Sequence, residues 1–404
     1  MKKAPHLLAA AIALCTILLL AVWGNFFARR QENLFVHALA ATKSNQAYNG
    51  SAFQRAASRY PDLLLIYGSS ELTQGDPRYQ SRAFFRKYPT DFMVFQVAKP
   101  AANALTIAQS LAALGSDLRG KKVVISFTPS LFLLPMLSQE YYNGNFSRLH
   151  AYELIFSPTL SRAVRQAAAR RMLDYPDSLA EDALLHFALQ HSAEDAPLDN
   201  ILLAFSWPLG RLQTTLIRQQ DHFASLNELT EKRLDSNIYP APAKIDWQGL
   251  LQKAREEQAP FSNNNPYGVD NVFWEQEYKA SFDQPIAPGS GDAEFLTSLE
   301  NSKEWQDFDL LLRVLTELGA RPLLISRPLN APFLEALGIS RRAQSVYYQK
   351  LTAAVASYPV TLVDFHTLDG DKTFSVDRTS HPSLAGWIYV NQALDAFYHD
   401  LRQP

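Results

Sequence analysis

The stretch that decides the fold reads LLLIYGSSEL at residues 63–72. Four aliphatic residues and a tyrosine run into a glycine, two serines and a glutamate, with none of the Asn, Asp or Pro that usually builds a turn. A continuous apolar run is typical of a strand that is covered on both faces, as in a parallel sheet between helices. We therefore expect a buried strand that passes directly into a helix, with the serines at the junction.

Four more apolar runs are bounded by polar or turn residues, at 91–99, 121–129, 320–328 and 360–366. Amphipathic stretches lie between or after them, at 103–118, 345–358 and 383–401. This alternation predicts an α/β fold with helices on both faces of a central, mostly parallel, five-stranded sheet.

The gap between the third and fourth runs is too long for one crossover, so residues 131–300 are expected to form an insertion. Its part at about 150–235 has a helical pattern, as in LSRAVRQAAARRML. The part that follows is rich in Asn, Pro, Gly and aromatic residues and predicts an ordered loop. The aromatic residues of 261–274 would either cap a core, which we favour, or shape a groove for an acceptor.

Composition places the chain among globular proteins. It has 404 residues, of which 47% are hydrophobic and 19% charged, enough to bury the core of one large domain or two ordinary ones. The formal net charge is −2, from 38 Lys and Arg against 40 Asp and Glu, and no basic run recurs beside aromatic residues. A nucleic-acid partner is therefore not expected.

The first thirty residues differ from the rest, because residues 7–23 carry no charge and Arg29 and Arg30 follow soon after. About 21 apolar residues are enough to cross a hydrocarbon layer of about 30 Å. The apolar run offers no clean A-x-A cleavage site, which argues against a cleaved signal peptide. Leu14 before Cys15 argues against a lipoprotein signal. We predict an uncleaved membrane anchor at 1–30 and a soluble domain at 31–404. Positive charges flank the anchor on both sides, so charge alone does not decide on which side of the membrane the domain lies.

Unusual residues follow the predicted strands, where α/β sheets collect their ligands. A serine at 69 or 70 would point into this cleft, although a pair of helix-capping serines explains the same residues. Near the other end of the chain, Asp377 and His381 lie in a polar loop before the last helix. A serine nucleophile needs a histidine base that a carboxylate orients, so these residues favour a catalytic site without metal or cofactor.

Four segments together resemble the DltD family of D-alanyl-lipoteichoic acid biosynthesis: YGSSEL, ISRPLNAPF, YYQKL and LVDFHTLDGDKTFSVDRTSHPSLAGW. The resemblance implies an anchored protein outside the cytoplasmic membrane with the α/β/α fold of SGNH (GDSL-type) hydrolases. The catalytic serine of those hydrolases falls on Ser70 and their histidine on His381. The acid usually lies three residues before the histidine; Asp377 lies four before it, and Asp369 or Asp371 are alternatives.

The Gly and Asn of the SGNH oxyanion hole have no clear counterpart in this chain. The hole would then use the backbone N–H of Ser70 and one from around Ala102 or Asn103, with Thr128 nearby. Arg327, after the fourth strand, would hold an anionic group of the substrate or, as an equal alternative, form a surface ion pair.

The resemblance implies a serine-dependent acyl transferase or (thio)esterase in D-alanylation of an envelope glycopolymer such as teichoic acid. Its implied partners are a membrane-bound O-acyltransferase (DltB-like), a D-alanyl carrier protein and the polymer. Two other functions stay open: an O-acetyl transferase or esterase of an exopolysaccharide or lipopolysaccharide, and a non-catalytic scaffold that binds an acyl carrier or polymer.

Overall fold

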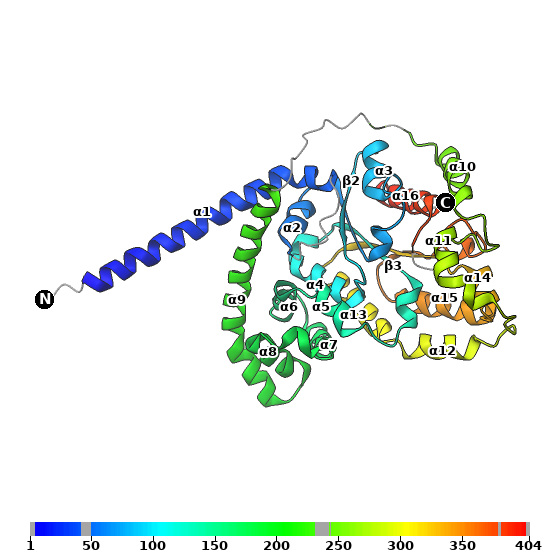
Figure 1. Ribbon diagram of the computed structural model, residues 1–404. Helices are drawn as coiled ribbons and strands as arrows, with labels where there is room; N and C mark the ends of the chain where they lie inside the picture. Colours follow the sequence, from blue (N-terminus) through cyan, green and yellow to red (C-terminus); the bar gives the residue numbers. More distant parts are fainter. Residues whose placement is uncertain (1–4, 42–49, 231–241, 243, 379–380, 401–404) are drawn as a thin grey trace.

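The predicted strands are all present in the computed structural model, which describes residues 5–41, 50–230, 242, 244–378 and 381–400 (Figure 1). Their bounds are Leu63–Gly68 (β1), Met93–Ala98 (β2), Lys122–Phe127 (β3), Arg321–Ser326 (β4) and Thr361–Val363 (β5). They form one sheet in the order β2-β1-β3-β4-β5, and every neighbouring pair is parallel. The predicted α/β class with a five-stranded parallel sheet is confirmed.

The two faces of the sheet carry two separate hydrophobic cores. Along β1, Leu63, Leu65 and Tyr67 join one core, whereas Leu64 and Ile66 join the other. The first core is covered by α4, α13 and α15 among other helices, and the second by α3, α10 and α16. The continuous apolar run thus reflects burial on both sides, because successive side chains of a strand point to opposite faces.

The helices occupy the connections between the strands and the long insertion. Those outside the insertion are α1 (Pro5–Ala41), α2 (Ala52–Ser58), α3 (Ser81–Lys87), α4 (Ala104–Leu114), α13 (Glu304–Glu317), α14 (Ala331–Ala336), α15 (Arg341–Val355) and α16 (Leu384–Tyr398). The predicted helices at 103–118, 345–358 and 383–401 correspond to α4, α15 and α16.

The region at 131–300 lies between β3 and β4, and most of its first part is helical, as predicted. Its helices are α5 (Gln139–Asn145), α6 (Arg148–Ile155), α7 (Arg162–Leu173), α8 (Ala183–Ala193), α9 (Pro197–Thr230), α10 (Trp247–Gln258), α11 (Asn271–Phe273) and α12 (Asp292–Asn301). Short helical turns, η5 to η7 (Ala259–Phe261, Trp274–Tyr278 and Lys279–Phe282), take up much of the segment expected to be loop.

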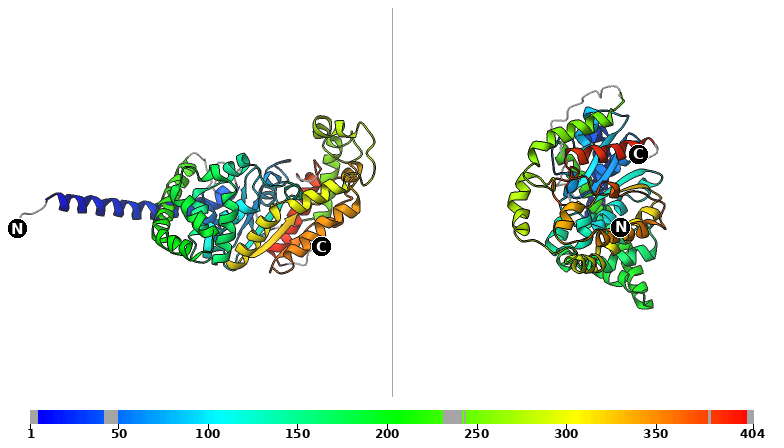
Figure 2. Two further views of the ribbon diagram at one scale, coloured as in Figure 1. Left: turned by 90° about the horizontal axis from the view of Figure 1, so that it is seen from below. Right: turned by 90° about the vertical axis from the view of Figure 1, so that its right-hand side faces the viewer.

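Helix α1 projects from the domain and is long and apolar enough to cross a membrane, the one such helix among the described residues (Figures 1 and 2). It does not end at the predicted boundary of residue 30. Its second half continues onto the domain, where Ala28, Glu32, Val36 and Ala40 are buried at four-residue spacing. This spacing places the four side chains on one face of the helix.

Candidate active site

The turn after β1 presents Ser70 at the carboxyl edge of the sheet. Ser70 is the first residue of the short 3-10 helix η1 (Ser70–Leu72), whose first backbone N–H groups have no partner within the helix. Glu71 folds back beneath the turn, and its Oε1 accepts a hydrogen bond from the Ser69 N–H at 2.9 Å. A Cβ on Gly68 would lie 2.4 Å from that oxygen, so the glycine is needed for this fold-back.

His381 reaches the same point from the other end of the chain. Its Nε2 lies 2.9 Å from Ser70 Oγ, and its Nδ1 lies 2.8 Å from Asp377 Oδ2. The Asp377 carboxylate also accepts from the His381 backbone N–H at 3.0 Å. The structure therefore brings the three predicted residues into one hydrogen-bonded chain, although Ser70 and His381 are 311 positions apart in the sequence.

The loop that carries Asp377 and His381 is held closed at its base. Ser375 and Pro382 form an isolated antiparallel bridge, and the Val376 N–H donates to the His381 carbonyl at 3.0 Å. Ser383 then caps α16 by accepting from the Gly386 N–H at 3.1 Å. The loop thus brings the Asp377 carboxylate to the His381 ring, although Asp377 lies four residues before the histidine instead of the usual three.

The two other acidic candidates have different partners. Asp369 accepts a hydrogen bond from Tyr348 at 2.5 Å, and Asp371 pairs with Arg255 at 2.7 Å. Of the three predicted carboxylates, it is Asp377 that contacts the histidine.

Burial and charge act on the histidine in opposite directions. Burial lowers the pKa of His381, but the hydrogen bond and charge of Asp377, helped by Glu71, outweigh it, so that the pKa is raised. A carboxylate on Nδ1 fixes the tautomer in which Nε2 is free to accept a proton. Ser70 and His381 are in the arrangement of a nucleophile and a general base.

Arg327 directly follows β4, as predicted, but its side chain is not at the surface. It is fully buried, so the predicted surface ion pair is wrong, and in this structure its guanidinium has no solvent-facing surface to offer an anionic substrate. Its Nη2 donates to Ser126 at 3.1 Å. Burial lowers the pKa of Arg327 to about 10, and the charge of Glu71 opposes this shift. Burial raises the pKa of Glu71, and the charge of Arg327 opposes that shift. Glu71 and Arg327 are thus two buried ionisable groups that act on each other's pKa, which no local sequence pattern indicated.

The expected oxyanion residues after β2 are engaged elsewhere. The Ala102 N–H donates to the Lys99 carbonyl at 3.0 Å, and the Asn103 N–H donates to Thr106 Oγ1 at 3.1 Å. The Asn103 side chain caps α4 through Thr106 and donates to Glu304 at 3.2 Å. Donation to a substrate by either N–H would require a change from this arrangement.

Thr128 follows β3 and is also buried, with its hydroxyl 2.8 Å from that of Ser130.

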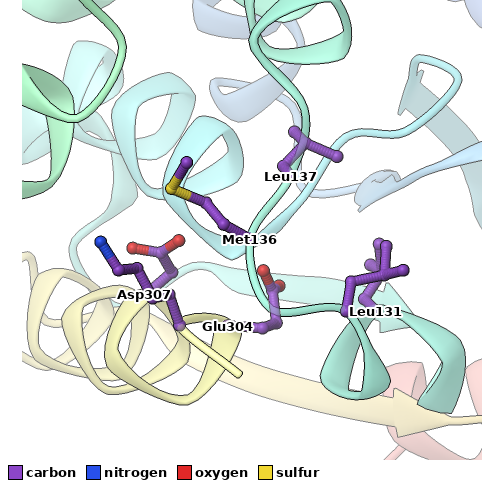
Figure 3. A pocket seen from close by; sticks show the side chains of 7 residues that line it. Leu131, Met136, Leu137, Glu304 and Asp307 are labelled. Atoms are coloured by element: carbon purple, nitrogen blue, oxygen red, sulfur yellow. The ribbon is translucent and has the colours of Figure 1, made fainter. Parts of the chain in front are cut away.

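The Glu304 that holds Asn103 belongs to a separate acidic cluster at a small pocket between η3 (Pro129–Leu133) and α13 (Figure 3). Burial, together with the charge of Asp307, raises the pKa of Glu304. Asp307 in turn is held by Arg171. Among the described residues no group of His, Cys, Asp or Glu is arranged to hold a metal ion.

The aromatic segment of the insertion packs against the Asp377 loop. Asp270 donates its N–H to the Val376 carbonyl at 2.7 Å, and Trp274 is buried in an aromatic cluster with Tyr267 and Phe282. Burial raises the pKa of Tyr278 to about 12, to which the nearby Asp377 charge contributes. The core-capping interpretation of this segment agrees with these contacts, which also brace the loop.

Comparison with known proteins matches residues 40–399 to a family model described as DltD protein. The chain belongs to the DltD family. Protein DltD of Bacillus subtilis (strain 168) is 24% identical over 360 residues, which cover 89% of this chain and 88% of that protein. Protein DltD of Staphylococcus aureus (strain NCTC 8325 / PS 47) is 23% identical over 403 residues, 99% of this chain and 96% of that one. The predicted DltD resemblance is confirmed, and the family match extends through the insertion.

Proposed function

We propose that this DltD-family protein is an anchored acyl transferase or (thio)esterase whose nucleophile is Ser70. The observation that carries the proposal is the hydrogen-bonded chain from Ser70 through His381 to Asp377. Nucleophile, base and orienting carboxylate in this order are the arrangement of serine acyl transfer on unrelated folds. Family membership supports D-alanine as the acyl group and a teichoic acid or similar glycopolymer as the acceptor.

In the first half-reaction, Ser70 Oγ attacks the carbonyl carbon of a D-alanyl ester or thioester while its proton passes to His381 Nε2. His381 then returns that proton to the leaving oxygen or sulfur as the carbonyl bond to it breaks. The product is a D-alanyl ester on Ser70. The backbone N–H of Ser70, the first residue of η1, would donate to the developing oxyanion.

In the second half-reaction, a polymer hydroxyl attacks the acyl-Ser70 carbonyl and gives its proton to His381. The bond to Ser70 Oγ breaks, and the serine regains a proton from the histidine. If water replaces the hydroxyl, the same steps release D-alanine, so the site chemistry serves an esterase equally well. Transfer adds an ammonium group to a polymer rich in phosphate and so reduces its negative charge.

Helix α1 supports a single-pass membrane anchor. The membrane would be the cytoplasmic one, with the domain outside the cytoplasm, because the proposed acceptor is a polymer of the cell envelope. The acyl group must then be delivered across the membrane in activated form. A membrane-bound O-acyltransferase that receives it from a D-alanyl carrier protein is the proposed source.

The test is covalent labelling of the full-length protein in detergent by a fluorescent fluorophosphonate, which reacts with activated serines. We expect labelling of the wild type and of Ser69→Ala, and none of Ser70→Ala or His381→Ala. An unlabelled wild type, with D-alanylation of cells preserved by Ser70→Ala, would instead indicate a scaffold. In cells with and without the protein, mild base should release D-alanine from the envelope polymer in different amounts; a difference in acetate would favour the O-acetyl function.

A further inference from the structure

The long helix α9 has an apolar face that is open to solvent. Six large apolar side chains on it are exposed by 50 to 78%: Leu198, Ile201, Phe205, Leu209, Leu212 and Leu216. Their spacing of three or four residues places them in one stripe. Between residues 196 and 219, all of them described, the exposed side chains include no charged group. A continuous apolar surface of this extent is unusual on a soluble domain and marks an interaction site.

The opposite face of α9 is already used by the fold. Helices α6, α8 and the second half of α1 pack on it, and a Cβ on Gly210 would lie 2.2 Å from the Phe156 ring. Asp221 is buried and accepts hydrogen bonds from the Ser51 and Ala52 backbone N–H groups at 2.9 Å. The helix is thus fixed on the domain, and its apolar stripe is turned outward.

The stripe lies on the side of the domain from which α1 projects. In Figures 1 and 2, α9 runs along that side, crosswise to α1. The two helices meet where the apolar half of α1 leaves the domain: His222 Nδ1 lies 2.8 Å from Glu32 Oε1, and a Cβ on Gly24 would lie 2.9 Å from the Phe223 ring. A bilayer that contains the apolar half of α1 must therefore begin beside α9.

We propose that α9 is an interfacial helix whose stripe inserts into the surface of the bilayer that α1 crosses. An apolar face without charge on a helix in the plane of the membrane enters the boundary between headgroups and acyl chains. The exposed Arg30 lies at the exit of α1, at the level where a cation meets lipid phosphates. The stripe consists of five Leu or Ile side chains and Phe205, and Leu and Phe are typical of the apolar face of an interfacial helix. Of the residue types enriched at protein interfaces (Tyr, Trp, Phe, Met and Arg) it contains only Phe, which favours lipid as its occupant.

The proposal is tested on the full-length protein in nanodiscs of phosphatidylcholine and phosphatidylglycerol. The chain has one cysteine, so Cys15→Ala gives a background for single reporter cysteines. Phe205→Cys and Leu209→Cys each carry an environment-sensitive fluorophore on the stripe. Phe261→Cys is the control, because Phe261 is 60% exposed and ends η5, the turn directly after α10. Figure 1 shows α10 on the part of the domain away from the projecting end of α1.

We expect blue-shifted emission at 205 and 209 and quenching by lipids that carry a nitroxide on the acyl chain. The probe at 261 should be quenched by aqueous iodide instead. The proposal is overturned if the probes at 205 and 209 are as accessible to iodide as the probe at 261. It is equally overturned if they are shielded from both quenchers, since contact with a protein or a second copy would give that result.

Discussion

Asp377→Asn is the most informative single change at the candidate site. Asp377 accepts two hydrogen bonds from His381, one from the backbone N–H at 3.0 Å and one at ring Nδ1 at 2.8 Å. In an asparagine the carbonyl oxygen can keep only one of these bonds. If it keeps the backbone N–H, the amide NH₂ faces Nδ1, the ring proton moves to Nε2, and the histidine can no longer accept the proton of Ser70.

The expected loss follows from this change of tautomer. In the serine-protease template, the same substitution lowers the rate roughly 10⁴-fold, which corresponds to about 5.4 kcal/mol of transition-state stabilisation. The assay is the pseudo-first-order rate constant of fluorophosphonate labelling, measured on full-length protein in detergent. Thermal unfolding of the same samples shows that the variant is folded.

Asp371→Asn is the matched control, since it makes the same chemical change in the same segment. The Asp371 carboxylate pairs with Arg255 and Thr373 and has its own hydrogen bonds away from His381. This variant should label at the wild-type rate. The reasoning is refuted if Asp377→Asn keeps that rate, or if both variants lose it equally.

Three further outcomes are expected. Ser69→Ala should leave the labelling rate nearly unchanged, because the Ser69 side chain makes no capping hydrogen bond, whereas Ser70→Ala should abolish labelling. Equal effects of the two substitutions would indicate that both serines only cap the helix. The rate should fall as the pH drops through the raised pKa of His381, so that the midpoint of the loss lies above the ordinary 6.5, and a midpoint below 6.5 contradicts this. Gly386→Ala should lower the unfolding temperature, since its Cβ would lie 2.1 Å from the Phe374 carbonyl oxygen; overpacking costs about 1–3 kcal/mol, and an unchanged melting curve would contradict the close contact.

The sheet could be predicted from the sequence because burial on both faces leaves a local signal. Each strand lies inside its predicted run, as Leu63–Gly68 does in LLLIYGSSEL. The strand order and the place of the insertion's helices depend on contacts between distant segments, which no single run encodes. The helical turns at 271–282 escaped prediction because Asn, Pro and Gly nearby indicate loops.

Part of the candidate site could be predicted because Ser70 closely follows the end of a strand. Ser70, Asp377 and His381 could be named because their chemistry requires one another. Arg327 also follows a strand, but its burial places it beside segments far away in the chain, such as Ser126, which is 201 residues earlier. For Asn103, the local signal was available: an Asn with a Thr three residues later resembles a capping box, and the structure forms one.

The anchor and the candidate site lie at opposite ends of the same strand. Just before β1, Asp62 is 3.0 Å from His37 of α1, so the amino edge of the sheet contacts the helix that is long and apolar enough to cross a membrane. Ser70 follows the other end of β1, about 20 Å further on by the rise of a six-residue strand. If α1 is the membrane anchor, it holds the domain by the sheet edge remote from Ser70, which leaves the proposed nucleophile on the edge away from that attachment. If α9 also rests on the bilayer, α1 and α9 together fix the tilt of the domain, and the height of Ser70 above the lipid becomes a property of the fold.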